Sequence, residues 1–223
     1  MMRRVNVGGV EIGGGAPISV QSMTNTQTAD VDATVAQIER LVAAGCEIVR
    51  VAVPDAEAAA ALPAIRKAIS IPLVADIHFD HRLALAAIEA GVDKLRLNPG
   101  NITDPGKIAQ VAEAAARARV PIRVGANSGS LAKAYLDAHG RASVAGMVDS
   151  ALHEIRLLER LGFADIVVSL KATDVRMTID AYRAIAREVD YPLHVGITEA
   201  GTVWEGAIRS AVGLGVLFAD GLG

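Results

Sequence analysis

Short apolar runs alternate with longer segments of helical periodicity along almost the whole chain. The apolar runs begin near residues 18, 48, 73, 94, 122, 165 and 193, and continuous runs of this kind are typical of strands buried in a parallel sheet. A proline opens four of the runs, and a glycine that ends the preceding helix comes before the other three; both are common at such boundaries. Regular alternation of strands and helices predicts parallel strands joined by right-handed crossovers.

The seven predicted strand–helix units fall one short of a TIM-type (β/α)8 barrel. The last helical segment leads to Gly221 and Gly223, which resembles the glycine exits before earlier strands. We therefore expect residues 1–223 to form an incomplete barrel domain that stops before strand eight, with a seven-stranded or open sheet as the alternative. At the other end of the chain, residues 5–12 flank the pair Gly8-Gly9, which predicts a β-hairpin that closes the bottom of the barrel.

Composition narrows the class of protein. A chain of 223 residues with 52% hydrophobic residues suits one folded α/β domain. A net charge of −3 and an aromatic content of 3% argue against nucleic-acid binding. Charges interrupt every apolar stretch, and no signal peptide is recognisable, so we expect a cytoplasmic protein without membrane contact. The single cysteine, Cys46, lies at a predicted helix–strand junction; we expect it to be buried, and alone it cannot hold an iron–sulfur cluster.

Three arginines interrupt the apolar runs. Arg50, Arg96 and Arg123 each have aliphatic residues on both sides. A buried guanidinium is costly unless a negative group meets it, and the chain has few carboxylates in comparable positions. Because the planar fork of arginine suits phosphate, the missing anion is predicted to be a phosphorylated ligand.

Polar residues gather where the predicted strands end, which is where barrels of this class carry their active sites. These residues are Asp76, His78, Asn98, Asn127, Ser169, Lys171, Thr198 and Glu199. Because side chains alternate along a strand, the three arginines and Lys171 should face the barrel interior. Four cations against two carboxylates, Asp76 and Glu199, leave a surplus of about two positive charges, which a diphosphate can neutralise.

Other interpretations of these residues stay open. Lys171 can act as a Schiff-base lysine, which makes a complete phosphate-handling lyase or aldolase an alternative. A non-catalytic ligand-binding fragment is a third possibility. His78 and His194 are as readily structural as functional. Metal binding has little support, because no His, Asp and Glu residues show ligand spacing.

Seven strings at the strand ends together resemble one family. They occupy residues 17–26, 50–54, 75–79, 96–101, 123–131, 169–172 and 196–201 and include ADIHF, RLNPGN and GITEAG. Found in this order, they resemble the hydroxymethylbutenyl diphosphate synthases of the methylerythritol phosphate route to isoprenoids, the IspG or GcpE family. The resemblance runs from one end of the chain to the other.

The resemblance implies an oxidoreductase. Its members reduce 2-C-methyl-D-erythritol 2,4-cyclodiphosphate by two electrons to hydroxymethylbutenyl diphosphate, with a 4Fe–4S cluster fed by ferredoxin or flavodoxin. The implied cationic cradle comprises Arg50, Arg96, Arg123 and Lys171. The implied polar neighbours are His78, Asn98, Asn127, Ser169 and Thr198. Glu199 matches the carboxylate that manages protons near the reacting carbon, and Asp76 fits a supporting role, such as orienting an arginine.

The chain departs from this family in one large respect. In the family, three cysteines and a glutamate in a separate C-terminal domain hold the cluster, and in the homodimer that domain covers the partner's barrel. Residues 1–223 include neither that domain nor barrel strand eight. We therefore expect this chain to hold no cofactor itself and to be inactive as an isolated fragment.

Overall fold

The structure, a computed structural model, describes residues 2–78, 80–97, 102 and 104–223. Its main feature is a curled parallel sheet with strand order β3-β4-β5-β6-β7-β8. The strands are β3 (Gln21–Met23), β4 (Ile48–Ala52), β5 (Leu73–Ile77), β6 (Lys94–Leu97), β7 (Ile122–Val124) and β8 (Ile166–Val168). Alternation of these strands with helices confirms the predicted barrel-type fold, with six strands forming a half barrel.

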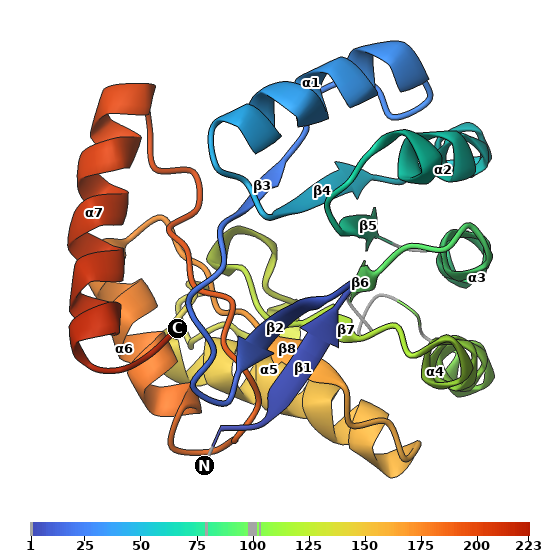
Figure 1. The fold of residues 1–223 in the computed structure, drawn as a ribbon. Helices are drawn as coiled ribbons and strands as arrows, with labels where there is room; N and C mark the ends of the chain where they lie inside the picture. Colours follow the sequence, from blue (N-terminus) through green and yellow to red (C-terminus); the bar gives the residue numbers. More distant parts are fainter. Residues whose placement is uncertain (1, 79, 98–101, 103) are drawn as a thin grey trace.

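Helices cover the outer face of this sheet, as Figure 1 shows. They are α1 (Val31–Ala43), α2 (Ala56–Ala68), α3 (His81–Glu89), α4 (Pro105–Ala118), α5 (Val144–Arg160) and α6 (Val175–Ile185). A further helix, α7 (Val203–Ala219), packs against α6 at the open side of the curve. The outward-facing strand residues pack beneath them: Val49, Leu73 and Leu95 are each 0% exposed. Such dense burial on the outer face is what leaves the inner face free to carry polar groups.

Side-chain alternation places the charged residues inside the curve. In the strand register, Asp76 on β5 lies opposite Arg96 on β6, and Arg96 lies opposite Arg123 on β7. Their sequence neighbours, including Leu95 and Val124, belong to the outer core. The predicted division between inward arginines and outward aliphatic residues is therefore confirmed for these strands.

A β-hairpin closes the N-terminal end of the half barrel. It consists of β1 (Arg4–Val7) and β2 (Val10–Gly13), which pair antiparallel. Gly8 and Gly9 both have positive φ, 55° and 97°, as a two-residue turn of this handedness requires. Val5 and Val7 form one buried cluster with three inward strand residues, Ile48, Val74 and Val167, and Figure 1 shows the hairpin lying across the middle of the curled sheet. The predicted role of this hairpin is confirmed.

Two predicted strands differ from the structure. The first begins at Gln21 rather than near residue 18, because the Glu47 carboxylate bonds the Val20 N–H at 2.8 Å. The seventh, expected from residue 193, is reduced to one bridge between Leu193 and Val168. There the Tyr182 hydroxyl bonds backbone groups of both segments, so these groups do not pair with each other.

Cys46 lies between α1 and β4 and is 7% exposed, which confirms the burial predicted for it. Its thiol contacts the Ile48 carbonyl oxygen at 3.0 Å. Within the described ranges, no helix combines the length and the apolar character that crossing a membrane requires.

Candidate anion-binding site

Asp76 holds two of the three interior arginines. Its carboxylate is buried on β5, 3.0 Å from Arg96 Nη1 and 3.5 Å from Arg50 Nε. One carboxylate therefore serves two guanidiniums that come from strands on either side of it. Its geometry is that of a residue that orients arginines, the role that the resemblance implied.

Arg123 has no such partner. It is 3% exposed on β7, and its Nη1 donates to Ser169 Oγ at 2.8 Å. Its Nε and Nη2 are buried and have no hydrogen-bond partner among the described residues. Burial, followed by repulsion from Arg50 and Arg96, lowers the pKa of Arg123 to about 9. Buried donors are almost always satisfied in folded proteins, and these two guanidinium nitrogens are an exception among the described residues.

Arg50 is also incompletely satisfied. Beyond Asp76, its Nε and Nη2 lie 3.2 and 2.9 Å from the thioether sulfur of Met23. A thioether is a weak acceptor, so this contact does little to balance the charge. Burial lowers the pKa of Arg50 from its ordinary value, and the nearby Asp76 carboxylate opposes that shift.

Lys94 is an interior cation that the sequence analysis missed. It is 1% exposed, and its Nζ donates to Gln21 Oε1 on β3 at 2.9 Å. Burial, then repulsion from Arg123 and Arg50, lowers the pKa of Lys94 to about 7. The available signal was its position two residues before Arg96 on the same strand, which puts both side chains on one face.

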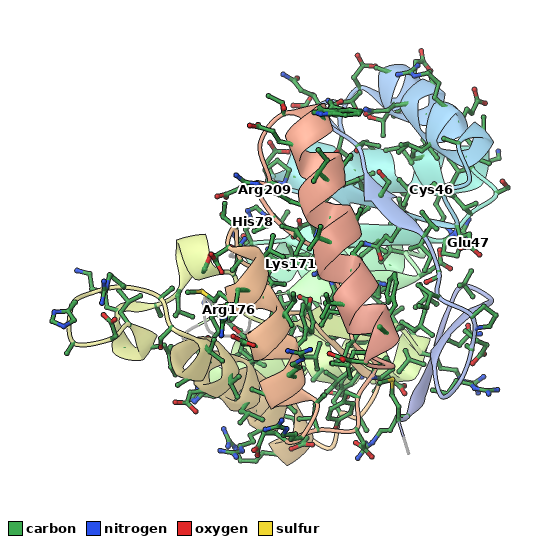
Figure 2. The ribbon with its side chains drawn as sticks, turned by 90° about the vertical axis from the view of Figure 1, so that its left-hand side faces the viewer. Cys46, Glu47, His78, Lys171, Arg176 and Arg209 are labelled. Carbon is green, nitrogen blue, oxygen red and sulfur yellow. The ribbon has the colours of Figure 1, made fainter. Side chains whose placement is uncertain are left out.

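Lys171 lies just beyond β8, where the backbone still pairs with the segment that follows β7. Its N–H donates to the Ala126 carbonyl, and its own carbonyl accepts from Ser128 N–H, both at 3.0 Å. Its Nζ is 3.1 Å from His194 Nε2. Burial, then repulsion led by Arg123, lowers the pKa of Lys171 to about 7. Figure 2 shows Lys171 deep in the molecule, behind α6 and α7.

The interior of the half barrel carries a strong positive excess. The cations gathered there are Arg50, Lys94, Arg96, Arg123 and Lys171. The described residues include two buried carboxylates, and only that of Asp76 contacts an arginine. The other, Glu154 on α5, accepts from Gly125 N–H at 2.9 Å, and burial raises its pKa to about 8. Most of the interior charge is therefore unbalanced near neutral pH.

Glu199 lies at the mouth of this interior. It is exposed and has a φ of 49°, a left-handed conformation that is uncommon outside glycine and clusters at functional sites. A Cβ added at Gly129 would stand 3.9 Å from both Glu199 carboxylate oxygens. The carboxylate therefore lies over the short helix Ser128–Ser130 that follows β7.

Four sequence-predicted residues remain: one lies near Asp76, two make backbone-associated contacts, and one lies outside the described residues. His78 is half-exposed beside the interior, with Nε2 3.4 Å from Asp76 Oδ1. Asn127 Oδ1 accepts from Gly129 N–H at 3.1 Å, and Thr198 joins the region through its N–H, 3.4 Å from the Ala172 carbonyl oxygen. Asn98 lies outside the described residues.

The described residues do not fit an iron–sulfur cluster. Such clusters are held by several cysteine thiolates, whereas Cys46 is the one cysteine of the sequence and is buried beside α1. No set of three His, Cys, Asp or Glu side chains in the described part of the chain is arranged to hold a metal ion. The chemistry that these residues offer is the binding and orientation of an anion.

A curled parallel sheet with outer helices and a cationic interior places the protein in the (β/α) barrel class. Solved structures support the fold. Dihydropteroate synthase from Yersinia pestis superposes with a TM-score of 0.72 at 13% identity, covering 100% of this chain and 90% of that chain. The 3-dehydroquinate dehydratase from Geobacillus kaustophilus HTA426 gives 0.65 at 18% identity, covering 96% and 85%.

Sequence comparison identifies the family. The family model described as the GcpE TIM-barrel domain matches residues 2–223, and the chain belongs to this family. Over 221 residues it is 60% identical to a protein of Geobacillus thermodenitrificans (strain NG80-2) and 57% identical to one of Geobacter sulfurreducens (strain ATCC 51573 / DSM 12127 / PCA). Both are named 4-hydroxy-3-methylbut-2-en-1-yl diphosphate synthase (flavodoxin). The matches cover 99% of this chain but 59% and 63% of those relatives, so the chain spans about three fifths of their length.

Proposed function

We propose that this chain is the substrate-binding barrel of a hydroxymethylbutenyl diphosphate synthase. Its ligand is the cyclic diphosphate of methylerythritol, whose phosphate groups bind among the interior cations. One observation carries the proposal: Arg123 presents two buried guanidinium nitrogens without a partner among the described residues, toward an interior where one carboxylate, that of Asp76, contacts Arg50 and Arg96. The names of relatives that are 60% identical to it supply the diphosphate chemistry.

Each cation has a distinct part in holding the anion. Arg123, fixed by Ser169, offers Nε and Nη2 to phosphate oxygens in the side-by-side geometry that phosphate prefers. Arg50 and Arg96 are held by Asp76 and add charge from the neighbouring strands. Lys171 approaches from the segment just beyond β8, which lies beside the segment that follows β7. Because Asp76 already fixes two of the guanidiniums, little conformational freedom is lost when the anion binds.

Glu199 supplies a carboxylate at the rim, above the anion. With the diphosphate held by the cations, the carbon skeleton of the ligand lies toward the mouth, where Glu199 exchanges a proton with it near the reacting carbon. The left-handed backbone at Glu199 is the kind of strain that a fixed catalytic geometry accounts for. His78, Asn127 and Thr198 bind the polar groups of the ligand from the same rim. Asn98, which lies outside the described residues, is proposed for the same role.

The reducing half of the reaction needs groups beyond those in residues 1–223. In this proposal the electrons come from flavodoxin, which is part of the relatives' names, or from ferredoxin. The 4Fe–4S cluster, the separate C-terminal domain and the homodimer stay predictions from the resemblance. The cytoplasmic location stays a prediction from the hydropathy pattern of the sequence.

Calorimetric titration of this chain with the cyclic diphosphate tests the proposal. We expect saturable binding that Arg123→Met weakens by at least thirtyfold and that Arg117→Met leaves unchanged. Arg117 is a suitable control because it is exposed on α4 and pairs with Glu113. Methylerythritol without phosphate should not bind. Binding of the cyclic diphosphate that is equal in the wild type and in Arg123→Met would contradict the proposal.

A second candidate function rests on Lys171 alone. Its pKa of about 7 leaves a neutral amine available for Schiff-base formation, as in lyases and aldolases. Borohydride reduction in the presence of phosphosugars, followed by mass spectrometry of the Lys171 peptide, distinguishes the two functions. A covalent adduct supports the lyase, and the diphosphate-binding proposal predicts none.

A further inference from the structure

A buried tyrosine stands between the two backbone segments behind the anion site. Tyr182, on α6, is 0% exposed. Its hydroxyl accepts from Leu170 N–H at 3.1 Å and donates to the His194 carbonyl oxygen at 2.6 Å. One hydroxyl group thus joins two strand-like segments that would otherwise pair directly, and both segments carry a side chain that enters the site.

These two side chains meet immediately beyond the tyrosine. Lys171 follows Leu170 in the chain, and its Nζ lies 3.1 Å from His194 Nε2. On its other side the ammonium packs against Gly196, where an added Cβ would stand 3.1 Å from Nζ. The position of Lys171 therefore depends on the spacing of the two segments that Tyr182 sets.

We propose that Tyr182 and His194 are positioning residues that hold the Lys171 ammonium in place for the anion. Tyr182 fixes the backbones from which Lys171 and His194 extend, and His194 fixes the ammonium itself. The inference rests on the proposed function, because it assumes that Lys171 contacts the bound diphosphate.

The protonation of His194 agrees with this role. Burial of the ring, followed by the charges of Arg123 and Lys171 and then of Lys94 and Arg50, holds the pKa of His194 well below its usual range. The imidazole is therefore neutral near pH 7, and with its proton on Nδ1 its Nε2 accepts a hydrogen bond from the Lys171 ammonium. A protonated imidazole would instead repel the ammonium.

A double-mutant cycle on this chain tests the inference, with the cyclic diphosphate as the titrated ligand. Tyr182→Phe keeps the buried ring and removes only the hydroxyl. We expect it to weaken binding about tenfold in the wild-type background and less than twofold in a Lys171→Met background, a coupling of about 1 kcal/mol by the usual conversion. The same fold-loss in both backgrounds would overturn the inference.

Tyr191→Phe is the matched control. Tyr191 is 2% exposed. Its hydroxyl donates to Glu159 at 2.8 Å and its ring stacks under Arg3, which is not one of the interior cations. We expect this variant to bind as the wild type does. A loss equal to that of Tyr182→Phe would mean that removing any buried tyrosine hydroxyl suffices, which contradicts a specific role.

Two substitutions of His194 keep the inference testable if Tyr182→Phe does not fold. His194→Gln places an acceptor near the position of Nε2, whereas His194→Leu places none. We expect the glutamine variant to bind within about threefold of the wild type and the leucine variant to lose about tenfold. Equal affinity in the two variants would overturn the role of His194. Failure of the wild type to bind would instead refute the proposed function itself.

Discussion

The two ends of the half barrel differ in how they are stabilised: the hairpin covers the start of the strands, and charged residues gather at their end. Along the inner face of three strands, an apolar residue is followed two positions later by a polar one: Ile48 by Arg50, Val74 by Asp76 and Val167 by Ser169. The apolar members pack with the hairpin valines into a closed cluster. The polar members belong to a cationic region that no set of described residues neutralises. One face of the sheet thus stabilises the fold at its start, and at its end it carries the proposed ligand site.

The largest effect is expected at the cationic end. Arg123→Met should weaken binding of the cyclic diphosphate by about 2–5 kcal/mol, the loss typical of removing one member of a desolvated charge pair. The same change should leave the stability of the ligand-free chain equal or higher, because an unpaired buried charge disappears. Thermal unfolding without ligand, beside calorimetric titration, measures both. A large loss of stability in the ligand-free variant would break the comparison between the two ends.

The next prediction is that pH changes stability and ligand affinity in opposite directions. Lys94 and Lys171 have a pKa of about 7 in the folded chain, below the ordinary lysine value of 10.5. Between these values the unfolded state binds more protons, so both lysines make the free energy of unfolding rise with pH from about 7 to about 10. Anion binding requires the protonated amines, so affinity should fall over this same window, by up to about tenfold per pH unit for each lysine.

Chemical unfolding and calorimetric titration at pH 6.5, 7.5 and 8.5 check these signs. The variant Lys94→Met should remove about half of both slopes, because one of the two lysines is then absent. Affinity that rises with pH would contradict the assignment of the lysines to the anion site.

A smaller effect is expected at the apolar end. Ile48→Val removes one methylene from the cluster with Val5 and Val7, which should lower the free energy of unfolding by about 0.5–1.5 kcal/mol. Affinity for the cyclic diphosphate should stay within twofold of the wild type, because no group of the anion site changes. Thermal unfolding and calorimetric titration of this variant should give the opposite pattern to Arg123→Met, with a loss of stability and an unchanged affinity. A larger loss of affinity than of stability would show that the two ends are not separable.

A small effect on binding is also expected for Glu199→Gln. Its carboxylate lies at the exposed rim rather than among the buried cations. We expect affinity within about threefold of the wild type. In a protein of the same length as the relatives, we expect the same substitution to abolish turnover. An Asp76→Asn variant, whose carboxylate contacts Arg50 and Arg96, should instead lose affinity.

The sequence allowed much of the fold to be predicted, because its strands are buried on the outer face by aliphatic residues. The arginines inside these runs indicated the anion site for the same reason: a charge amid aliphatic residues stands out. Lys94 was missed because it begins its apolar run and follows Asp93, so aliphatic residues do not flank it on both sides.

Other features depend on contacts between distant segments. The strand expected from residue 193 is reduced to a bridge because Tyr182, on a helix, bonds its backbone. The sharing of Asp76 between two arginines follows from the register of three strands. The left-handed backbone of Glu199 has no signature in residue type, since such positions usually carry glycine.

The central claim is that Arg123 is completed by a diphosphate, and a crystal structure of this chain with the cyclic diphosphate tests it most directly. The account predicts phosphate oxygens within hydrogen-bond distance of Arg123 Nε and Nη2, with Asp76 still between Arg50 and Arg96. A diphosphate bound elsewhere, with Arg123 paired to a carboxylate of the chain, would contradict it.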